Sequence, residues 1–244
     1  MNIYESARRS AAELAYPKQS IQIFESLNGR VLDVFQEIEA WDGWRLMHDP
    51  ATPRETILAV IREIYRSVCW YQPHTTEAAF HMIGRLPKAE VRLMQALAAH
   101  KAEEAEHGLW AREDMAKLGE NDLAVSSPAT FAVSAVWWRI AFHEEPLGYL
   151  GAEYLYEQLT AIATRETLPL IEARDLPESE LRFVIEHATE DAKHATFLKH
   201  HILDIVTRYP GSEIAMQRCL DYFRCVWPLP VWKEAVDRAT ESVR

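Results

Sequence analysis

Apolar residues along this sequence recur every three to four positions, the spacing that places side chains on one face of an α-helix. Few stretches alternate apolar and polar residues with the period of two that a half-buried β-strand requires. The chain contains only 8 glycines in 244 residues, and its 48% hydrophobic content is enough for a substantial core. These features predict an all-α protein made of helices packed against one another.

Interruptions of the periodicity divide the chain into helical segments. Prolines in HDPATP, QPH and RYPG, the glycine of KLGEND and the restart RDLPESE mark the boundaries. We expect helices over about residues 18–40, 53–72, 75–84, 88–118, 127–142, 146–168, 177–207 and 211–226, and a short one after Pro230. Because no long linker, repeat or low-complexity tract separates them, the sequence predicts a single helical-bundle domain over residues 1–244.

Composition narrows the class of partner. The formal net charge of −11 argues against nucleic acid and anionic membranes, since both are bound by clustered Lys and Arg. No apolar run approaches the roughly 20 residues of a membrane span. The chain has 3 cysteines and no CxxC spacing, which favours neither a disulfide framework nor a zinc ribbon. We therefore expect a cytoplasmic protein that acts on a small molecule.

Polar residues interrupt the buried stripe of the segment 88–118. Glu104 and His107 differ by about 60° around a helix axis and by one turn along it, so their side chains can converge on one point. This ExxH spacing is the one that carboxylate-bridged di-metal bundles use. The stripe runs Leu93, Leu97, His100, Glu104, His107, Ala111.

The segment 146–168 carries one carboxylate in an otherwise apolar stripe. Glu157 follows Leu147, Leu150 and Tyr154 on that line. Burying an unpaired carboxylate costs several kcal/mol in practice, so such a residue is usually protonated, paired or bound to a metal. Glu153, one turn earlier on a neighbouring face, is the alternative inward carboxylate.

The segment 177–207 contains HATEDAKHA, with His187, Asp191 and His194 at offsets of four and three. All three side chains face one side of the helix, and apolar residues bracket them. A single core histidine is more often a hydrogen-bonded structural residue than a ligand. Three helices together, however, supply three imidazoles and three carboxylates, which suits two divalent cations of the iron or manganese type better than zinc.

These motifs resemble those of the haem-oxygenase-like di-metal oxidases, relatives of the thiaminase-type and coenzyme-quinone-oxidase helical bundles. The resemblance covers about residues 55–207. HATEDAKHATFL has the family's HxxxDxxH, HKAEEAEHGLWAREDMAKLG is similar to its segment of paired glutamates and histidine, and LGYLGAEYLYE is similar to the helix that brings a bridging glutamate.

The resemblance implies a haem-oxygenase-like fold and an Fe(II)-dependent oxidase or oxygenase. Two Fe(II) ions, or manganese, would use O₂ as cosubstrate to oxidise a small organic acid or amino acid by decarboxylative or C–C cleavage, desaturation or N-oxygenation. Some relatives place their first carboxylate where this chain has His100, which leaves that role open between Glu104 and Glu103. The implied ligands are Glu104, His107, Glu157, His187, Asp191 and His194.

Other interpretations stay open. A metal-free thiaminase-like hydrolase or cofactorless oxidase of the same fold would use a nucleophile such as Cys69, and a non-catalytic binding protein would use the six residues as a buried hydrogen-bond network. Haem binding is less favoured, because the histidines are mixed with carboxylates. We expect a homodimer, the commonest oligomer of soluble enzymes.

Two groups of side chains are assigned only by pattern. Charged residues between 101 and 117 outside the stripe are expected on a solvated face. Aromatic residues between 137 and 156 are expected mainly in the core, with a substrate cavity as the alternative. These aromatic residues are Trp137, Trp138, Phe142, Tyr149, Tyr154 and Tyr156.

Overall fold

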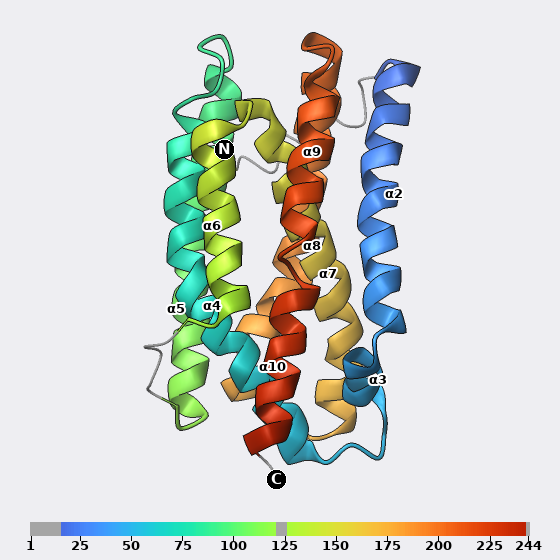
Figure 1. The fold of residues 1–244 in the computed structure, drawn as a ribbon, viewed down its shortest axis with the longest axis vertical. Coiled ribbons are helices and arrows are strands. Elements are labelled where there is room, and N and C mark those ends of the chain that lie inside the picture. Colours follow the sequence, from blue (N-terminus) through green and yellow to red (C-terminus); the bar gives the residue numbers. More distant parts are fainter. Residues whose placement is uncertain (1–15, 121–125, 243–244) are drawn as a thin grey trace.

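The computed structural model describes residues 16–120 and 126–242. Every regular element in these two ranges is a helix (Figure 1), which confirms the all-α prediction. The α-helices are α2 (Lys18–Ala40), α3 (Asp42–His48), α4 (Arg54–Ile83), α5 (Val91–Lys117), α6 (Pro128–His143), α7 (Tyr149–Ala173), α8 (Arg182–Arg208), α9 (Ser212–Arg224) and α10 (Leu229–Ser242). Two short 3-10 helices, η1 (Pro146–Gly148) and η2 (Glu178–Glu180), precede α7 and α8.

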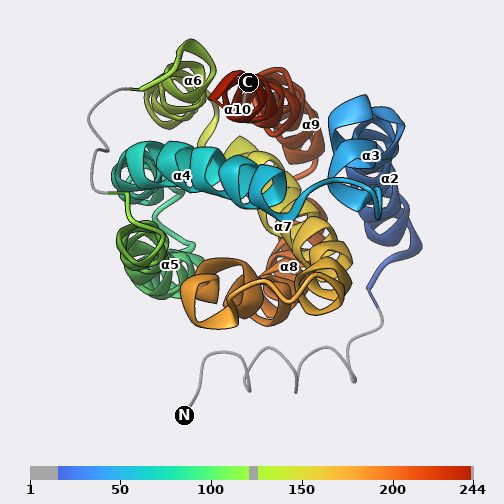
Figure 2. The same ribbon diagram turned by 90° about the horizontal axis from the view of Figure 1, so that it is seen from below.

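The long helices α4, α5, α7 and α8 surround a common interior when the bundle is viewed along its length (Figure 2). Helices α6, α9 and α10 lie along one side of this group, and α2 with α3 lies on another. One cluster of buried apolar side chains draws members from α2 and from α4 to α10. No helix in the described part of the chain combines the length and apolar character needed to cross a membrane.

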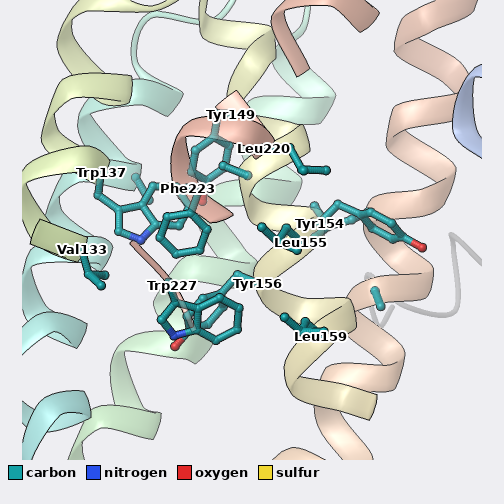
Figure 3. Packing of buried hydrophobic residues seen from close by; sticks show 14 of the residues in the cluster. Val133, Trp137, Tyr149, Tyr154, Leu155, Tyr156, Leu159, Leu220, Phe223 and Trp227 are labelled. Atoms are coloured by element: carbon teal, nitrogen blue, oxygen red, sulfur yellow. The ribbon is translucent and has the colours of Figure 1, made fainter. Parts of the chain in front are cut away.

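Helix α7 occupies the middle of the bundle. Every residue from Tyr149 to Glu157 is buried, whichever way it points around the axis. A helix that is buried on all sides must be covered by neighbours on all sides, and α7 packs mainly against α8 and α9. Figure 3 shows Tyr149 and Tyr156 of α7 among aromatic residues that include Trp137 of α6 and Phe223 of α9. Any carboxylate on this part of α7 is therefore forced into the interior.

Two helices continue through a proline, past the ends that we expected for them. Pro73 lies within α4, which replaces the two predicted helices 53–72 and 75–84, and Pro169 lies within α7, beyond the predicted end at residue 168. An interior proline costs about 3 kcal/mol. After Pro73, however, Met82 and Ile83 are buried, and burial of each such side chain contributes about 1.5–3 kcal/mol. The apolar face thus outweighs the proline in α4.

Smaller departures occur at other helix ends. Helix α3 was not predicted, because its seven residues, DGWRLMH, contain a glycine and are too short to show a period. Helix α8 begins at Arg182, after η2, rather than at residue 177, and α10 is 14 residues long with Pro230 in its first turn. Helix α6 starts as expected, since Ser127 accepts a hydrogen bond from the Thr130 N–H and Pro128 follows it.

The packing of α7 on α9 depends on Gly151. A Cβ atom at this position would overlap the backbone of Met216, which cannot move as a flexible side chain would. We predict that Gly151→Ala lowers the free energy of unfolding by about 1–3 kcal/mol, the usual cost of overpacking. Gly29→Ala in α2 is the matched control, since its Cβ meets nothing within 4 Å and should stabilise by about 0.5–1 kcal/mol. Urea unfolding curves that rank the two variants in the reverse order would contradict this packing.

Candidate metal centre

The polar positions of three helical stripes meet in the interior of the bundle. Helix α5 contributes Glu104 and His107, α7 contributes Glu157, and α8 contributes three further residues. None of the six is more than 3% exposed. The three from α8 are His187, Asp191 and His194. The structure therefore brings all six of the predicted residues into the interior, on helices that face one another.

The start of α8 is fixed to α5 by a buried hydrogen bond. The Phe183 N–H donates to Asp114 Oδ2 on α5 at 2.7 Å, which satisfies one of the backbone donors left free at a helix start. One turn later, His187 Nδ1 lies 2.6 Å from the Phe183 carbonyl oxygen. Because a carbonyl oxygen only accepts, Nδ1 carries the proton and Nε2 keeps the lone pair that a metal would need. This contact sets both the orientation and the tautomer of His187.

Glu104 lies at the point where the three helices converge. Its Oε1 atom is 3.1 Å from His107 Nδ1 and 3.0 Å from His194 Nδ1. Glu157 Oε2 approaches the same His194 nitrogen at 3.3 Å. One atom from each of His100, Glu104, Glu157 and His194 lies within 4.8 Å of the others, and the same holds for Glu104, His107 and His187. Glu104 is thus shared by two adjacent groups of potential ligands.

The donor atoms fit a metal better than they fit one another. Neither His107 Nδ1 nor Glu104 Oε1 makes a hydrogen bond of acceptable geometry within the described residues, although the two atoms are close. Metal bonds of about 2.1 Å place neighbouring ligand atoms about 3 Å apart, which is the spacing seen around Glu104. The oxygen and nitrogen donors also suit iron or manganese.

Asp191 lies beside these two groups rather than within either. Its Oδ1 atom is 3.9 Å from His194 Nδ1. Neither carboxylate oxygen has a hydrogen-bond partner in the part of the chain that the structure describes, although the residue is only 1% exposed. A buried, ionised carboxylate that accepts no hydrogen bond is costly, so Asp191 must be either protonated or balanced by a cation.

His100, whose role the sequence left open, lies with the predicted ligands. Its Nε2 atom is 3.2 Å from Glu157 Oε1 and 3.9 Å from Glu104 Oε1. Glu103, the alternative first carboxylate, is only half-buried. Glu104 rather than Glu103 therefore lies between the two groups, and His100 is a further potential ligand.

Lys101 and Glu153 form a buried ion pair at the edge of the centre. Lys101 is 5% exposed and its Nζ atom also lies 3.7 Å from Glu157 Oε1. The expectation of a solvated face between residues 101 and 117 is wrong for Lys101 and for Asp114, which is fully buried. Helix α5 packs against both α4 and α8, so its buried surface is wider than one stripe. The sequence signal for the pair was weak, because only Glu153 stood out as inward.

The ion pair changes the titration of both partners. Burial disfavours the charged ammonium, but the neighbouring Glu153 raises the pKa of Lys101 above its usual value. Burial raises the pKa of Glu153 to about 7, although Lys101 acts in the opposite direction. Each group thus depends on the other to remain charged in the interior.

The pKa values within the centre diverge according to the charges nearby. Burial disfavours a charged imidazole, but contacts with Glu104 and Glu157 raise the pKa of His194 to about 11. Burial lowers the pKa of His187 to about 4. Burial, reinforced by the charges of Glu157 and Glu104, raises the pKa of Asp191 well above its usual value. The carboxylates of the centre thus concentrate negative charge, which favours protonation of His194 and Asp191. Bound cations would balance the same charge.

Comparison with a solved structure supports the fold. The chain is similar to a domain of unknown function with a heme oxygenase-like fold from Shewanella denitrificans OS217. The TM-score is 0.67 at 21% sequence identity, and the match covers 86% of this chain and 92% of that one. The haem-oxygenase-like fold that the sequence motifs implied is therefore confirmed.

Comparison of the sequence itself gives the family. No curated protein matches the chain. The model of a family described as iron-containing redox enzymes matches residues 62–221, which extend from α4 into α9 and include all the residues of the centre. Because this match spans well over half of the sequence, the chain belongs to the iron-containing redox enzymes.

Proposed function

We propose that this chain is a non-haem diiron oxidase or oxygenase, which uses O₂ to oxidise a small organic acid or amino acid. The family supports an oxidoreductase that contains iron. The observation that carries the diiron proposal is the sharing of Glu104 by two groups of buried potential ligands. A carboxylate shared in this way is the arrangement by which helical bundles hold two metal ions together.

The proposal gives each side chain a role. His107, His187 and Glu104 would hold one ion, while Glu157 and His194 would hold the other with Glu104. Asp191 would turn its two unsatisfied oxygens toward the second ion, and His100 stands available as a further ligand. Bound Fe(II) would supply the electrons for the reduction of O₂.

The chain itself supplies charge balance and orientation. Three ligand carboxylates largely offset the charge of two divalent ions, and the Lys101–Glu153 pair adds no net charge. The Phe183 carbonyl holds His187 in the tautomer that leaves Nε2 free. Gln72 donates from Nε2 to the Glu104 carbonyl at 3.2 Å, which ties α4 to the ligand helix α5. Burial of all these groups excludes bulk water from the reaction.

The rival interpretations find less support. A cysteine nucleophile must ionise, but burial raises the pKa of the Cys69 thiol to about 11. A non-catalytic scaffold would need a closed network of hydrogen bonds, and both oxygens of Asp191 lack partners among residues 16–120 and 126–242. The expected homodimer stays a prediction.

Iron stoichiometry of two neighbouring variants tests the shared carboxylate. Protein loaded anaerobically with Fe(II) should bind about two irons per chain. Glu104→Gln should bind less than one, because both groups lose a ligand, and its iron affinity should fall by more than the roughly 10- to 100-fold typical of an outer-shell change. Glu106→Gln, at an exposed position two residues further along α5, is the control and should bind like the unaltered protein. Normal iron content in Glu104→Gln would refute the diiron proposal.

A second prediction concerns the contribution of the Lys101–Glu153 ion pair to the stability of the metal-free protein. Lys101→Met should lower the stability of the metal-free protein by about 3 kcal/mol, because it leaves Glu153 buried without its counter-charge. The double variant Lys101→Met/Glu153→Leu should recover most of that loss, since an apolar pair replaces an ionic one. Lys193→Met, which removes a partly exposed partner of Glu190, should cost less than about 1 kcal/mol. Denaturant unfolding that gave equal losses for Lys101→Met and Lys193→Met would contradict this role.

A further inference from the structure

An apolar cavity of about 110 Å³ lies between α4 and α7. Residues of α3, α8 and α10 and Trp227 complete its wall. Its outer part is lined by half-buried residues of α3, among them Trp44 and Met47, and its inner part by the buried residues Tyr71 and Tyr156. The cavity therefore runs from near the surface into the interior of the bundle.

The inner end of the cavity adjoins the candidate metal centre. Tyr156 directly precedes Glu157 on α7, and the Phe183 ring in the cavity wall lies 4.0 Å from the His187 ring, centre to centre. Tyr156 packs against Trp227 at 4.7 Å between ring centres, as Figure 3 shows. A single layer of side chains thus separates the cavity from the proposed ligands.

The described wall of the cavity carries no Asp, Glu, Lys or Arg, and the histidine in it, His48, has Nδ1 2.8 Å from the Trp44 carbonyl oxygen. Its threonines, which could have offered hydroxyl groups, already use them within α7. Thr160, Thr164 and Thr167 donate to the carbonyl oxygens four residues earlier, at 2.8, 2.7 and 2.8 Å. The hydroxyl protons are thus committed to α7, so the threonines offer no free donor to a ligand. With its proton on Nδ1, a neutral His48 presents Nε2 to the cavity side only as an acceptor, so no wall residue carries a fixed charge, and burying a charged group there would be costly.

We propose that this cavity binds an uncharged, apolar part of the substrate while the polar part reaches the metal centre. This inference rests on the proposed function and narrows it: the substrate is a hydrophobic acid or amine with a ring or alkyl group, rather than an acid or amino acid charged at both ends. An apolar cavity of about 150 Å³ takes up benzene and otherwise stays dry. A cavity of about 110 Å³ thus accommodates a group of roughly six carbons.

A series of straight-chain alkanols, added to the metal-free protein, tests the cavity alone. Alkanols carry an alkyl chain and no carboxylate, so their binding does not require a metal. Four tryptophans line the cavity and provide a fluorescence signal, namely Trp41, Trp44, Trp227 and Trp232. Affinity should rise about fourfold for each added methylene and level off near six carbons, when the cavity is full. An affinity that does not change with chain length would overturn the proposal.

A variant that fills the cavity locates the binding. Ala163 is buried in the cavity wall on α7, and Ala163→Leu would occupy part of the space. The point at which affinity levels off should then move about three carbons earlier, because the leucine side chain adds that many. Ala173→Leu, at an exposed position of the same helix, should leave the series unchanged. If both variants behave alike, the alkanols bind elsewhere and the proposal fails.

These experiments test the proposal for the cavity and the proposal for the metal centre independently of each other. His194→Ala should lose iron yet retain the full dependence of alkanol affinity on chain length. If alkanol affinity depends on chain length but the unaltered protein binds no iron, the diiron proposal is wrong and the cavity remains an apolar binding site. Two bound irons together with a flat alkanol series would leave the metal centre and overturn the assignment of the cavity.

Discussion

Glu104 of α5 is buried where α5 meets α7 and α8. Burying an ionised carboxylate there costs several kcal/mol of folding free energy unless positive charge or hydrogen-bond donors surround it. Three further carboxylates, those of Glu153, Glu157 and Asp191, lie in the same interior. Lys101 pairs with Glu153 and lies 3.7 Å from Glu157 Oε1, so one ammonium faces several carboxylates. In the proposed diiron protein, bound cations would balance this charge, and their binding would account for the polar side chains that continue the stripes of three helices.

The packing of the bundle serves this centre in two ways. Helix α7 is covered on all sides, so Glu157 cannot turn toward water, and Gly151 permits the close approach of α9 that completes this cover. The hydrogen bond from the Phe183 N–H to Asp114 fixes where α8 begins relative to α5. On the other side of α7, the packing leaves an apolar cavity next to the centre, with Tyr156 and Phe183 between the two. Fold, ligands and cavity thus depend on the same few helices.

Much of this arrangement could be predicted from the sequence, because helical periodicity fixes which residues share a face. The stripes through Glu104, Glu157 and His194 follow directly from steps of three and four residues. The pairing of Lys101 with Glu153 could not be predicted, since it depends on how two helices are rotated against each other. The continuation of α4 through Pro73 could not be predicted either, because tertiary packing there outweighs the local tendency of proline to end a helix. The cavity is likewise a property of packed helices, not of one segment.

The most direct test of the account is anomalous X-ray diffraction at the iron edge from crystals of the protein loaded anaerobically with Fe(II). A diiron centre that shares Glu104 would give two iron peaks per chain, one on each side of the Glu104 carboxylate, with His187 and His194 on different ions. A single peak, no peak, or iron bound away from α5, α7 and α8 would contradict it.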